Sequence, residues 1–429
     1  YIQYLVENRA LPVEGETLIS SEVVDISVKA NQWGWRPVGV LSTPAWLDPA
    51  TWKTVPEDLD DQEREKWVRR NLWYFSYEAM QPPLYYAANV PVYAALPEDP
   101  FIKLFGMRIL AALLASTLVP LTWLTAREAC PGNRFVVYGA PVAVLLTQGY
   151  ALNMSQITND ALIVPLAAGT VLLLLRLVAR GLSWKRSLTA GVAIGASLLA
   201  KMTAIFLLPV ALAALALMVY YRRERFGRSM AHAAVIFGTA FTIMAPWIAH
   251  NFAAYGDATG ANAARPLMSS FFTSPLVSLG SLRLEELMPT YWFGEPVFPF
   301  AFWTYAWMAL GAAMVMSILG VICYFYRPDD EGDTSHLDGG VRSARLPLNF
   351  VMAAFVIGAA VTLLIPFGSG IGGVPGRYLY PLLPVGSVLL IFGIEQLLGR
   401  RRALFVSELM LVWLVVWESL NQLAYIQSL

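Results

Sequence analysis

Long apolar runs separated by short charged loops occupy the chain from residue 104 onward. Most of these runs approach the roughly 20 apolar residues that a helix needs to cross a bilayer. The pattern predicts about ten transmembrane helices, near residues 104–126, 135–152, 160–178, 187–200, 203–221, 230–249, 300–326, 347–366, 378–398 and 403–421. We therefore expect an all-α, polytopic integral membrane protein.

The N-terminal quarter of the chain follows a different pattern. Residues 1–103 contain no apolar run long enough to span a bilayer, and Glu57–Trp73 is charged throughout, which predicts a surface helix. The segment Leu84–Leu96 is apolar but short and contains Pro91, so we expect an interfacial or re-entrant helix. The expected organisation is a first loop (1–103), six membrane helices (104–249), a second loop (250–299) and four further helices (300–429) with a linker at 327–346.

Composition agrees with this class. Hydrophobic residues make up 57% of the chain and charged residues only 14%, against about 25% in soluble domains. Lys and Arg together number 30, as do Asp and Glu, so no net charge attracts a nucleic acid. The aromatic content suits belts of Trp and Tyr at the two membrane interfaces.

Loop charges predict the orientation. The basic loops are 127–134, 180–186, 222–228, 327–345 and 400–402, and the loops that alternate with them are poorer in cations. By the positive-inside rule the basic set faces the cytoplasm of a plasma or inner membrane. Residues 1–103 are then outside, which leads us to expect a signal peptide or a further membrane helix upstream of Tyr1.

The first candidate site residues along the chain lie between Ser76 and Tyr86. Pro82 and Pro83 force a turn before a helix can start, which presents Glu78 and Gln81 at the helix start. Free N–H groups at such a start suit an anionic group such as a phosphate. The alternative is an interfacial helix whose phenols, Tyr85 and Tyr86, anchor it among the lipid headgroups.

Polar residues also gather on the side predicted to be outside. Arg108 lies a turn inside the outer end of the first span, and Asn159 and Asp160 lie in the tight loop between the second and third. Lys201 separates the fourth span from the fifth, and Arg377 with Tyr378 opens the ninth. Ionisable groups at membrane depth are costly unless paired or hydrated, so this set predicts a phosphate site facing a polar cavity. Alternatively the two arginines snorkel to the interface, Asp160 caps its helix, and Lys201 caps the end of the preceding one.

The sequence gives less support to a metal site or a nucleotide-binding site. His250 is the one histidine placed to reach the outer side, and together with Glu78 it leaves a bound divalent cation open. The sequence contains no Walker loop, dinucleotide fingerprint, zinc spacing or G-x-S-x-G elbow. Any reaction must therefore use a substrate that has been activated elsewhere.

Five short motifs stand in order along the chain: residues 77–86 (YEAMQPPLYY), 159–162 (NDAL), 198–204 (LLAKMTA), 246–257 (from PW to YGD) and 376–384 (GRYLYPLLP). In this order they resemble the GT-C membrane glycosyltransferases. They are most similar to the branch of the dolichyl-phosphate-mannose protein mannosyltransferases and aminoarabinose lipid A transferases. The resemblance covers most of the chain.

The resemblance implies an inverting transfer of a sugar from a polyprenyl-phosphate donor to a lipid, glycan or protein acceptor on the extracytoplasmic face. It implies an acidic general base in the first outer loop, expected upstream of Tyr1. By the same resemblance Glu78 and Gln81 belong to the donor or acceptor pocket and Tyr85 and Tyr86 to its wall. Arg108, Lys201 and Arg377 would neutralise the donor phosphate.

This chain departs from the family pattern at two positions, where Met80 replaces a His or carboxylate and Gln81 replaces a Lys found in the lipid A branch. The first departure argues against a metal at that position. Two alternatives stay open: a flippase or transporter of a polyprenyl-linked or anionic lipid, and a non-catalytic partner that keeps the fold. The sugar and the acceptor are not identified by the sequence.

Overall fold

The computed structural model describes residues 1–13, 16–17, 19–20, 23, 77–260, 291–292, 302–326, 340–369, 376–410, 412 and 415–416. These residues are helical or lie in turns, and they contain no β-strand. The surface helix predicted at Glu57–Trp73, most of the loop 250–299 and the linker residues 327–339 lie outside the described residues.

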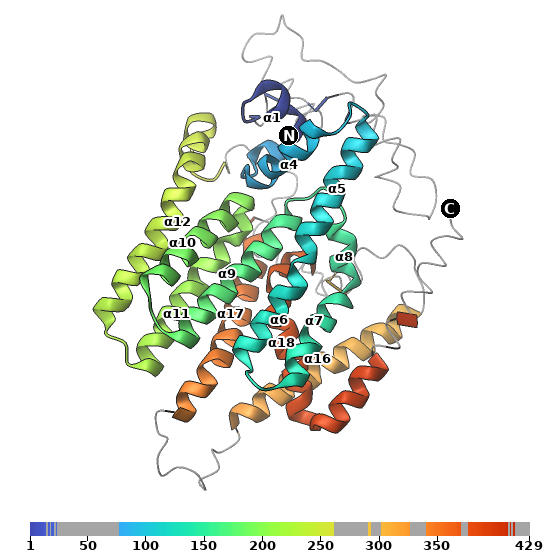
Figure 1. Ribbon diagram of the computed structural model, residues 1–429, viewed down its shortest axis with the longest axis vertical. Helices are drawn as coiled ribbons and strands as arrows, with labels where there is room; N and C mark the ends of the chain where they lie inside the picture. Colours follow the sequence, from blue (N-terminus) through green and yellow to red (C-terminus); the bar gives the residue numbers. More distant parts are fainter. Residues whose placement is uncertain are drawn as a thin grey trace, which may run out of the picture.

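The helices form a bundle with α1 and α4 lying across one end (Figure 1). They are α1 (Ile2–Asn8), α4 (Leu84–Ala95), α5 (Pro100–Ser116), α6 (Leu118–Ala129), α7 (Arg134–Leu145), α8 (Gln148–Met154), α9 (Asp160–Arg180), α10 (Trp184–Ala200), α11 (Leu207–Arg222), α12 (Phe226–Tyr255), α16 (Phe302–Tyr326), α17 (Gly340–Ser369) and α18 (Leu383–Leu398). Short 3₁₀ helices η4 (Tyr77–Met80), η5 (Met202–Phe206) and η7 (Gly376–Leu382) precede α4, α11 and α18.

Helix α9 is the centre of the bundle. It packs against α5, α6, α10, α11 and α17, and most of its side chains are buried. A helix that is apolar on all sides can be buried in this way, and the charged residues of α9 are confined to its first residue and its last turns. Its first residue, Asp160, is therefore held at the end of the bundle where α4 lies.

By length and composition, six described segments could cross a membrane: Pro100–Ala129, Asp160–Arg180, Met202–Arg222, Phe226–Tyr255, Arg345–Leu363 and Gly376–Leu398. The bent pair α7 and α8 makes a seventh if it counts as one span. The predicted count of about ten is not confirmed. Helix α10 has 17 residues, and Leu310–Tyr326, the part of α16 whose side chains the structure describes, has the same length. The last predicted span, 403–421, lies largely outside the described residues.

Threonines interrupt the first two predicted spans. The first is divided at Thr117, whose hydroxyl donates to the carbonyl of Leu114. The second bends by 53° between α7 and α8, where the Thr147 hydroxyl donates to the carbonyl of Ala143. Hydroxyls that bond back to the preceding turn bend helices. Hydropathy alone did not reveal these breaks, because both threonines lie within otherwise apolar runs.

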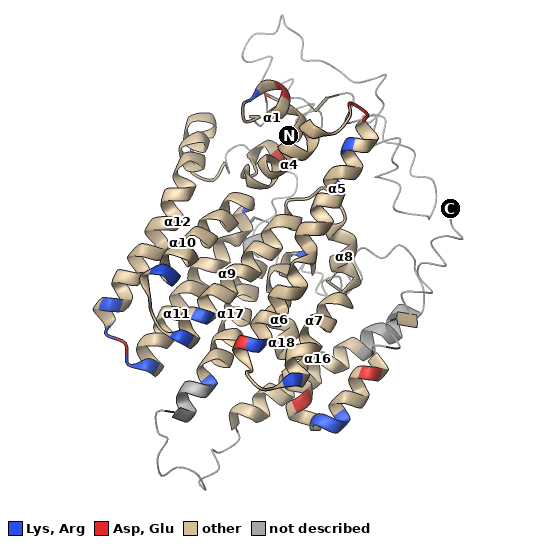
Figure 2. Ribbon diagram, in the orientation of Figure 1, with Lys and Arg blue, Asp and Glu red and all other residues tan. Residues whose placement is uncertain are grey.

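Basic residues gather at the end of the bundle opposite α1 and α4 (Figure 2). At this end Arg180 lies 2.6 Å from a carboxylate oxygen of Glu128, and Arg186 donates to the carbonyls of Arg180 and Gly181. Cations there also satisfy helix C-terminal carbonyls and complement the helix dipole. The alternation of loop charge therefore corresponds to two separate ends of the bundle, while the membrane face of each end stays a prediction.

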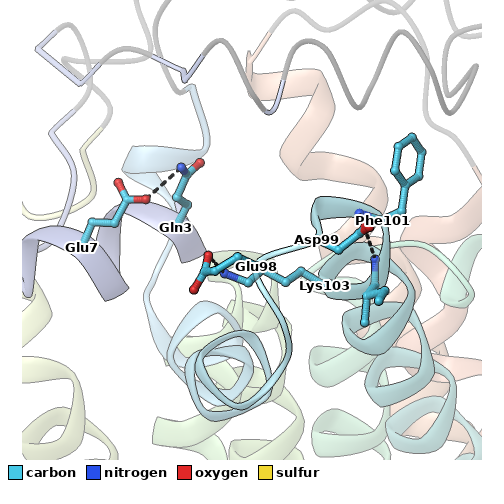
Figure 3. A network of polar contacts seen from close by, with 7 residues as sticks. Gln3, Glu7, Glu98, Asp99, Phe101 and Lys103 are labelled. Atoms are coloured by element: carbon cyan, nitrogen blue, oxygen red, sulfur yellow. Dashed lines mark hydrogen bonds and ion pairs between the residues drawn. The ribbon is translucent and has the colours of Figure 1, made fainter.

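The junction of α4 and α5 turns the chain from the end of the bundle into its body. Asp99 accepts hydrogen bonds from the N–H groups of Phe101 and Ile102 and so caps α5. Lys103 is buried, pairs with Glu98 at 2.6 Å, and lies 4.2 Å from the ring centre of Tyr93. Figure 3 shows this cap and ion pair beside α1. These contacts hold α4 across the end of the bundle.

Small residues allow α10 and α12 to pack closely. A Cβ added at Gly191 would lie 2.6 Å from the carbonyl oxygen of Ile236, and one at Gly195 would lie 2.9 Å from Cβ of Ile243. Glycines four residues apart are typical of close helix contacts in membranes. This close packing fixes the ends of α10 and α12 relative to each other. Lys201 follows the end of α10, and His250 lies near the end of α12, so both candidate residues are positioned by this contact.

Candidate functional site

The Pro-Pro stretch forms the turn that its sequence predicts. Glu78 lies in η4, and α4 begins at Leu84 directly after Pro83. The Tyr86 hydroxyl donates a hydrogen bond to Oε2 of Glu78 at 2.5 Å. The ring of Tyr86 stacks on Tyr1 with 4.0 Å between ring centres. Glu78 is thus fixed from the first turns of α4, and its carboxylate is partly buried.

Gln81 joins this stretch to the start of α9. Its side-chain oxygen accepts a hydrogen bond from Nδ2 of Asn159 at 3.4 Å, across 78 residues of sequence. Its backbone oxygen accepts from the Tyr1 hydroxyl at 3.3 Å. Sequence reasoning did not single out Tyr1, and no local pattern marks it, because its role comes only from where α1 packs.

Tyr85 packs edge-on against Tyr86 and provides an uncharged, buried surface there. It is fully buried and shares a core cluster with Tyr150 and Tyr380. Burial raises the pKa of the Tyr85 phenol above its ordinary value, because an anionic phenolate loses its hydration there. Its hydroxyl therefore stays protonated across the physiological pH range.

Lys201 and Asp160 form an ion pair between the ends of two helices. Nζ of Lys201 lies 2.6 Å from Oδ1 of Asp160, and the side chains are 13% and 11% exposed. Lys201 occupies the extended residue after α10, as expected from its position between two apolar runs. Asn159, not Asp160, stands at the N-cap of α9, so the interpretation of Asp160 as a helix cap is wrong. The carboxylate instead holds the ammonium group.

Tyr378 connects a second cation to this pair. Its ring centre lies 5.7 Å from Nζ of Lys201 and 5.8 Å from Cζ of Arg377. Both distances are within the range of cation–π attraction. Arg377 is exposed at the start of η7. The structure thus brings Lys201, with its partner Asp160, and Arg377 together near one ring, although they come from three elements far apart in sequence.

Arg108 has a different position from the other two predicted phosphate ligands. Its Nε donates to the carbonyl oxygen of Ser155 at 2.9 Å. Ser155 ends α8 and begins the turn that leads to Asn159. Arg108 therefore fastens this turn, and the described contacts join it to the backbone rather than to Lys201 or Arg377.

His250 lies near the end of α12, which approaches η4. The imidazole stacks on Trp247 with 5.1 Å between ring centres, and Tyr255 packs edge-on against it. After Tyr255 the chain turns back, and a Cβ on Gly260 would lie 3.8 Å from Cβ of Met80. Among the described residues no three His, Cys, Asp or Glu side chains gather to hold a metal. A divalent cation held by His250 and Glu78 would therefore have no third His, Cys, Asp or Glu ligand among the described residues.

The comparisons with known proteins bear on this arrangement. Residues 101–250 match the protein family described as dolichyl-phosphate-mannose-protein mannosyltransferase, PMT_2. The PMT_2 region runs from α5 through most of α12 and includes Arg108, Asn159, Asp160, Lys201 and His250. Glu78 and Arg377 lie outside it, and the fold brings them to the same end of the bundle.

Two solved structures also align with the chain. The apo crystal structure of ArnT from Cupriavidus metallidurans is 14% identical, with a TM-score of 0.34 over 77% of this chain and 71% of that one. The structure of the same protein bound to undecaprenyl phosphate is 13% identical, with a TM-score of 0.32 over 76% and 70%. Neither alignment is close enough to transfer a residue role. No curated protein matches the chain.

Proposed function

We propose that the chain is a GT-C glycosyltransferase. It takes a sugar from a polyprenyl-phosphate donor and passes it, with inversion, to a hydroxyl group of an acceptor on the extracytoplasmic face. The PMT_2 match over residues 101–250 supports the class of reaction. The observation that carries the assignment of the site is that Lys201, paired with Asp160, and Arg377 both lie near the ring of Tyr378, at the end of α9 away from the basic loops.

In this proposal the cations bind the donor phosphate. Asp160 neutralises Lys201 in the donor-free protein, so the ammonium group is held in place without a large desolvation cost. An incoming phosphate then shares Lys201 with Asp160 and engages the exposed Arg377. As the bond between the anomeric carbon and the phosphate oxygen breaks, negative charge grows on the leaving phosphate. Fixed cations stabilise that charge more in the transition state than in the ground state.

We assign Glu78 to the acceptor side of this site as the general base, in place of the acid that the resemblance implies upstream of Tyr1. The acceptor oxygen forms a bond to the anomeric carbon on the face opposite the phosphate, and its proton passes to a carboxylate acting as general base. Glu78 is positioned by the Tyr86 hydroxyl and lies three residues before Gln81, which contacts Asn159 beside Asp160. Tyr85 and Tyr86 then form the wall of the pocket.

Lipid binding by the full chain tests the phosphate site. Wild type and Arg377→Ala are purified in detergent and titrated with undecaprenyl phosphate, with Arg401→Ala as the control because Arg401 is equally exposed but lies at the basic end. We expect Arg377→Ala to bind the lipid about tenfold more weakly, as for loss of one charge-assisted contact, and Arg401→Ala to bind like wild type. Equal affinities in all three proteins would overturn the assignment. Tight binding without transfer from any polyprenyl-phosphate sugar would favour the flippase alternative.

A further inference from the structure

Three neighbouring side chains near the end of α12 carry buried polar atoms without hydrogen-bond partners. They are Nε1 of Trp247, Nε2 of His250 and Oδ1 of Asn251. Trp247 is 2% exposed and Asn251 is fully buried. Residues at i, i+3 and i+4 lie on one face of a helix, so the three belong to a single surface of α12. Buried polar groups in native proteins are almost always hydrogen-bonded, and three such atoms together call for an occupant.

A second Trp–His pair, formed between α10 and α12, shows the contrast. His232, near the start of α12, stacks on Trp184 with 4.1 Å between ring centres. Its Nδ1 lies 2.8 Å from the Ser187 hydroxyl, so the ring has a hydrogen-bond partner within the protein. The hydrogen bond of His232 at the basic end is therefore made within the protein. The pair formed by Trp247 and His250 has the same stacking but lacks such a partner.

The incomplete cluster is connected to the proposed site through the turn that follows α12. Nδ2 of Asn251 donates to the carbonyl of Ala258 at 3.1 Å, which holds the turn after α12. That turn brings Gly260 against Met80, two residues from Glu78. The turn that Asn251 holds therefore reaches the short helix that carries Glu78, the carboxylate that we assign to the acceptor side.

We propose that Trp247, His250 and Asn251 form the subsite that binds the hydroxyl groups of the transferred sugar. The indole offers a donor, the amide oxygen an acceptor, and the imidazole nitrogen either role according to its tautomer. A sugar hydroxyl is both donor and acceptor and matches this set. A phosphate carries only acceptors and would meet the lone pairs of Asn251, so it belongs at Lys201 and Arg377. This inference rests on the proposed function and adds the residues that recognise the sugar.

The test compares lipids with and without a sugar. The full-length wild type and His250→Phe are titrated with undecaprenyl phosphate and with undecaprenyl-phosphate mannose, glucose and 4-amino-4-deoxyarabinose. His250→Phe keeps an aromatic ring over Trp247 and removes the nitrogen. We expect it to bind the preferred sugar-bearing lipid about tenfold more weakly, as for loss of one hydrogen bond, and to bind undecaprenyl phosphate within twofold of wild type. Trp247→Phe should give the same selective loss.

His232→Phe is the matched control, because it alters the same residue type on the same helix at the other end. It should change the affinities for sugar-bearing and sugar-free lipids by the same factor, whatever its effect on thermal stability. A loss in His250→Phe that is equal for both kinds of lipid, or no loss at all, would overturn the subsite and leave the phosphate site standing. The same holds if wild type gains nothing from any of the three sugars. Wild type that binds none of these lipids would overturn the proposed function itself.

Discussion

Nζ of Lys201 and Oδ1 of Asp160 lie 2.6 Å apart across 41 residues of sequence, at the junction of two helix ends. Each side chain is largely buried, so neither charge is well solvated without the other. Removing either partner would therefore leave a buried, unpaired charge, and the intact pair holds a cation in place for the donor phosphate.

Breaking the pair should destabilise the protein. Asp160→Asn leaves the Lys201 ammonium without its counter-charge, and we expect a loss of about 3 kcal/mol. Thermal unfolding in detergent measures the change. Combining Asp160→Asn with Lys201→Met should cost less than the sum of the single changes, since the two residues are in direct contact. Strictly additive effects would show that the pair is not coupled.

Removing the carboxylate of Glu78 should affect turnover more than binding. Glu78→Gln keeps the shape of the side chain and its contact with Tyr86, but it cannot accept a proton. We expect sugar transfer to fall by about 100-fold, typical of a lost general base, with donor affinity unchanged. Tyr86→Phe is the control that removes only the hydrogen bond, and it should lower transfer severalfold. Wild-type turnover in Glu78→Gln would return this residue to a packing role.

The close contact of α10 and α12 predicts a difference between two glycines. Gly191→Ala places a methyl group 2.6 Å from the Ile236 carbonyl, and this overpacking should cost about 1–3 kcal/mol of stability. Gly238→Ala lies on α12 where a Cβ meets nothing within 4 Å, so it should be neutral or slightly stabilising. The two melting temperatures, measured side by side, check this, and equal values would argue against the helix contact.

Cysteine labelling tests the predicted orientation. In a Cys323→Ser background, Thr259→Cys lies exposed at the end of the bundle where η4 lies and Lys185→Cys lies exposed at the basic end. An impermeant maleimide applied to intact cells should label position 259 and leave position 185 unmodified until the membrane is opened. Labelling of position 185 alone would invert the topology and move the site to the cytoplasmic face.

Much of the local structure could be predicted from residue patterns. The apolar runs that fall in the described residues are helices, the Pro-Pro pair starts α4, and Lys201 separates two helices. The breaks at Thr117 and Thr147 were not predicted, because a threonine whose hydroxyl bonds to the preceding turn also occurs in unbroken helices, as Thr122 and Thr170 show. The role of Tyr1 was missed for a similar reason, since stacking on Tyr86 depends on where α1 docks.

The sequence by itself determined that the chain is helical and membrane-embedded, because backbone groups in lipid must be satisfied within each apolar segment. It also determined which end of each helix carries polar and charged residues. Only the tertiary structure decided which of those residues meet. Lys201 pairs with Asp160, while Arg108 bonds to the backbone at Ser155. Such pairings depend on how far each helix extends past its neighbours and which face it turns to them, and side-chain packing along the whole bundle sets both.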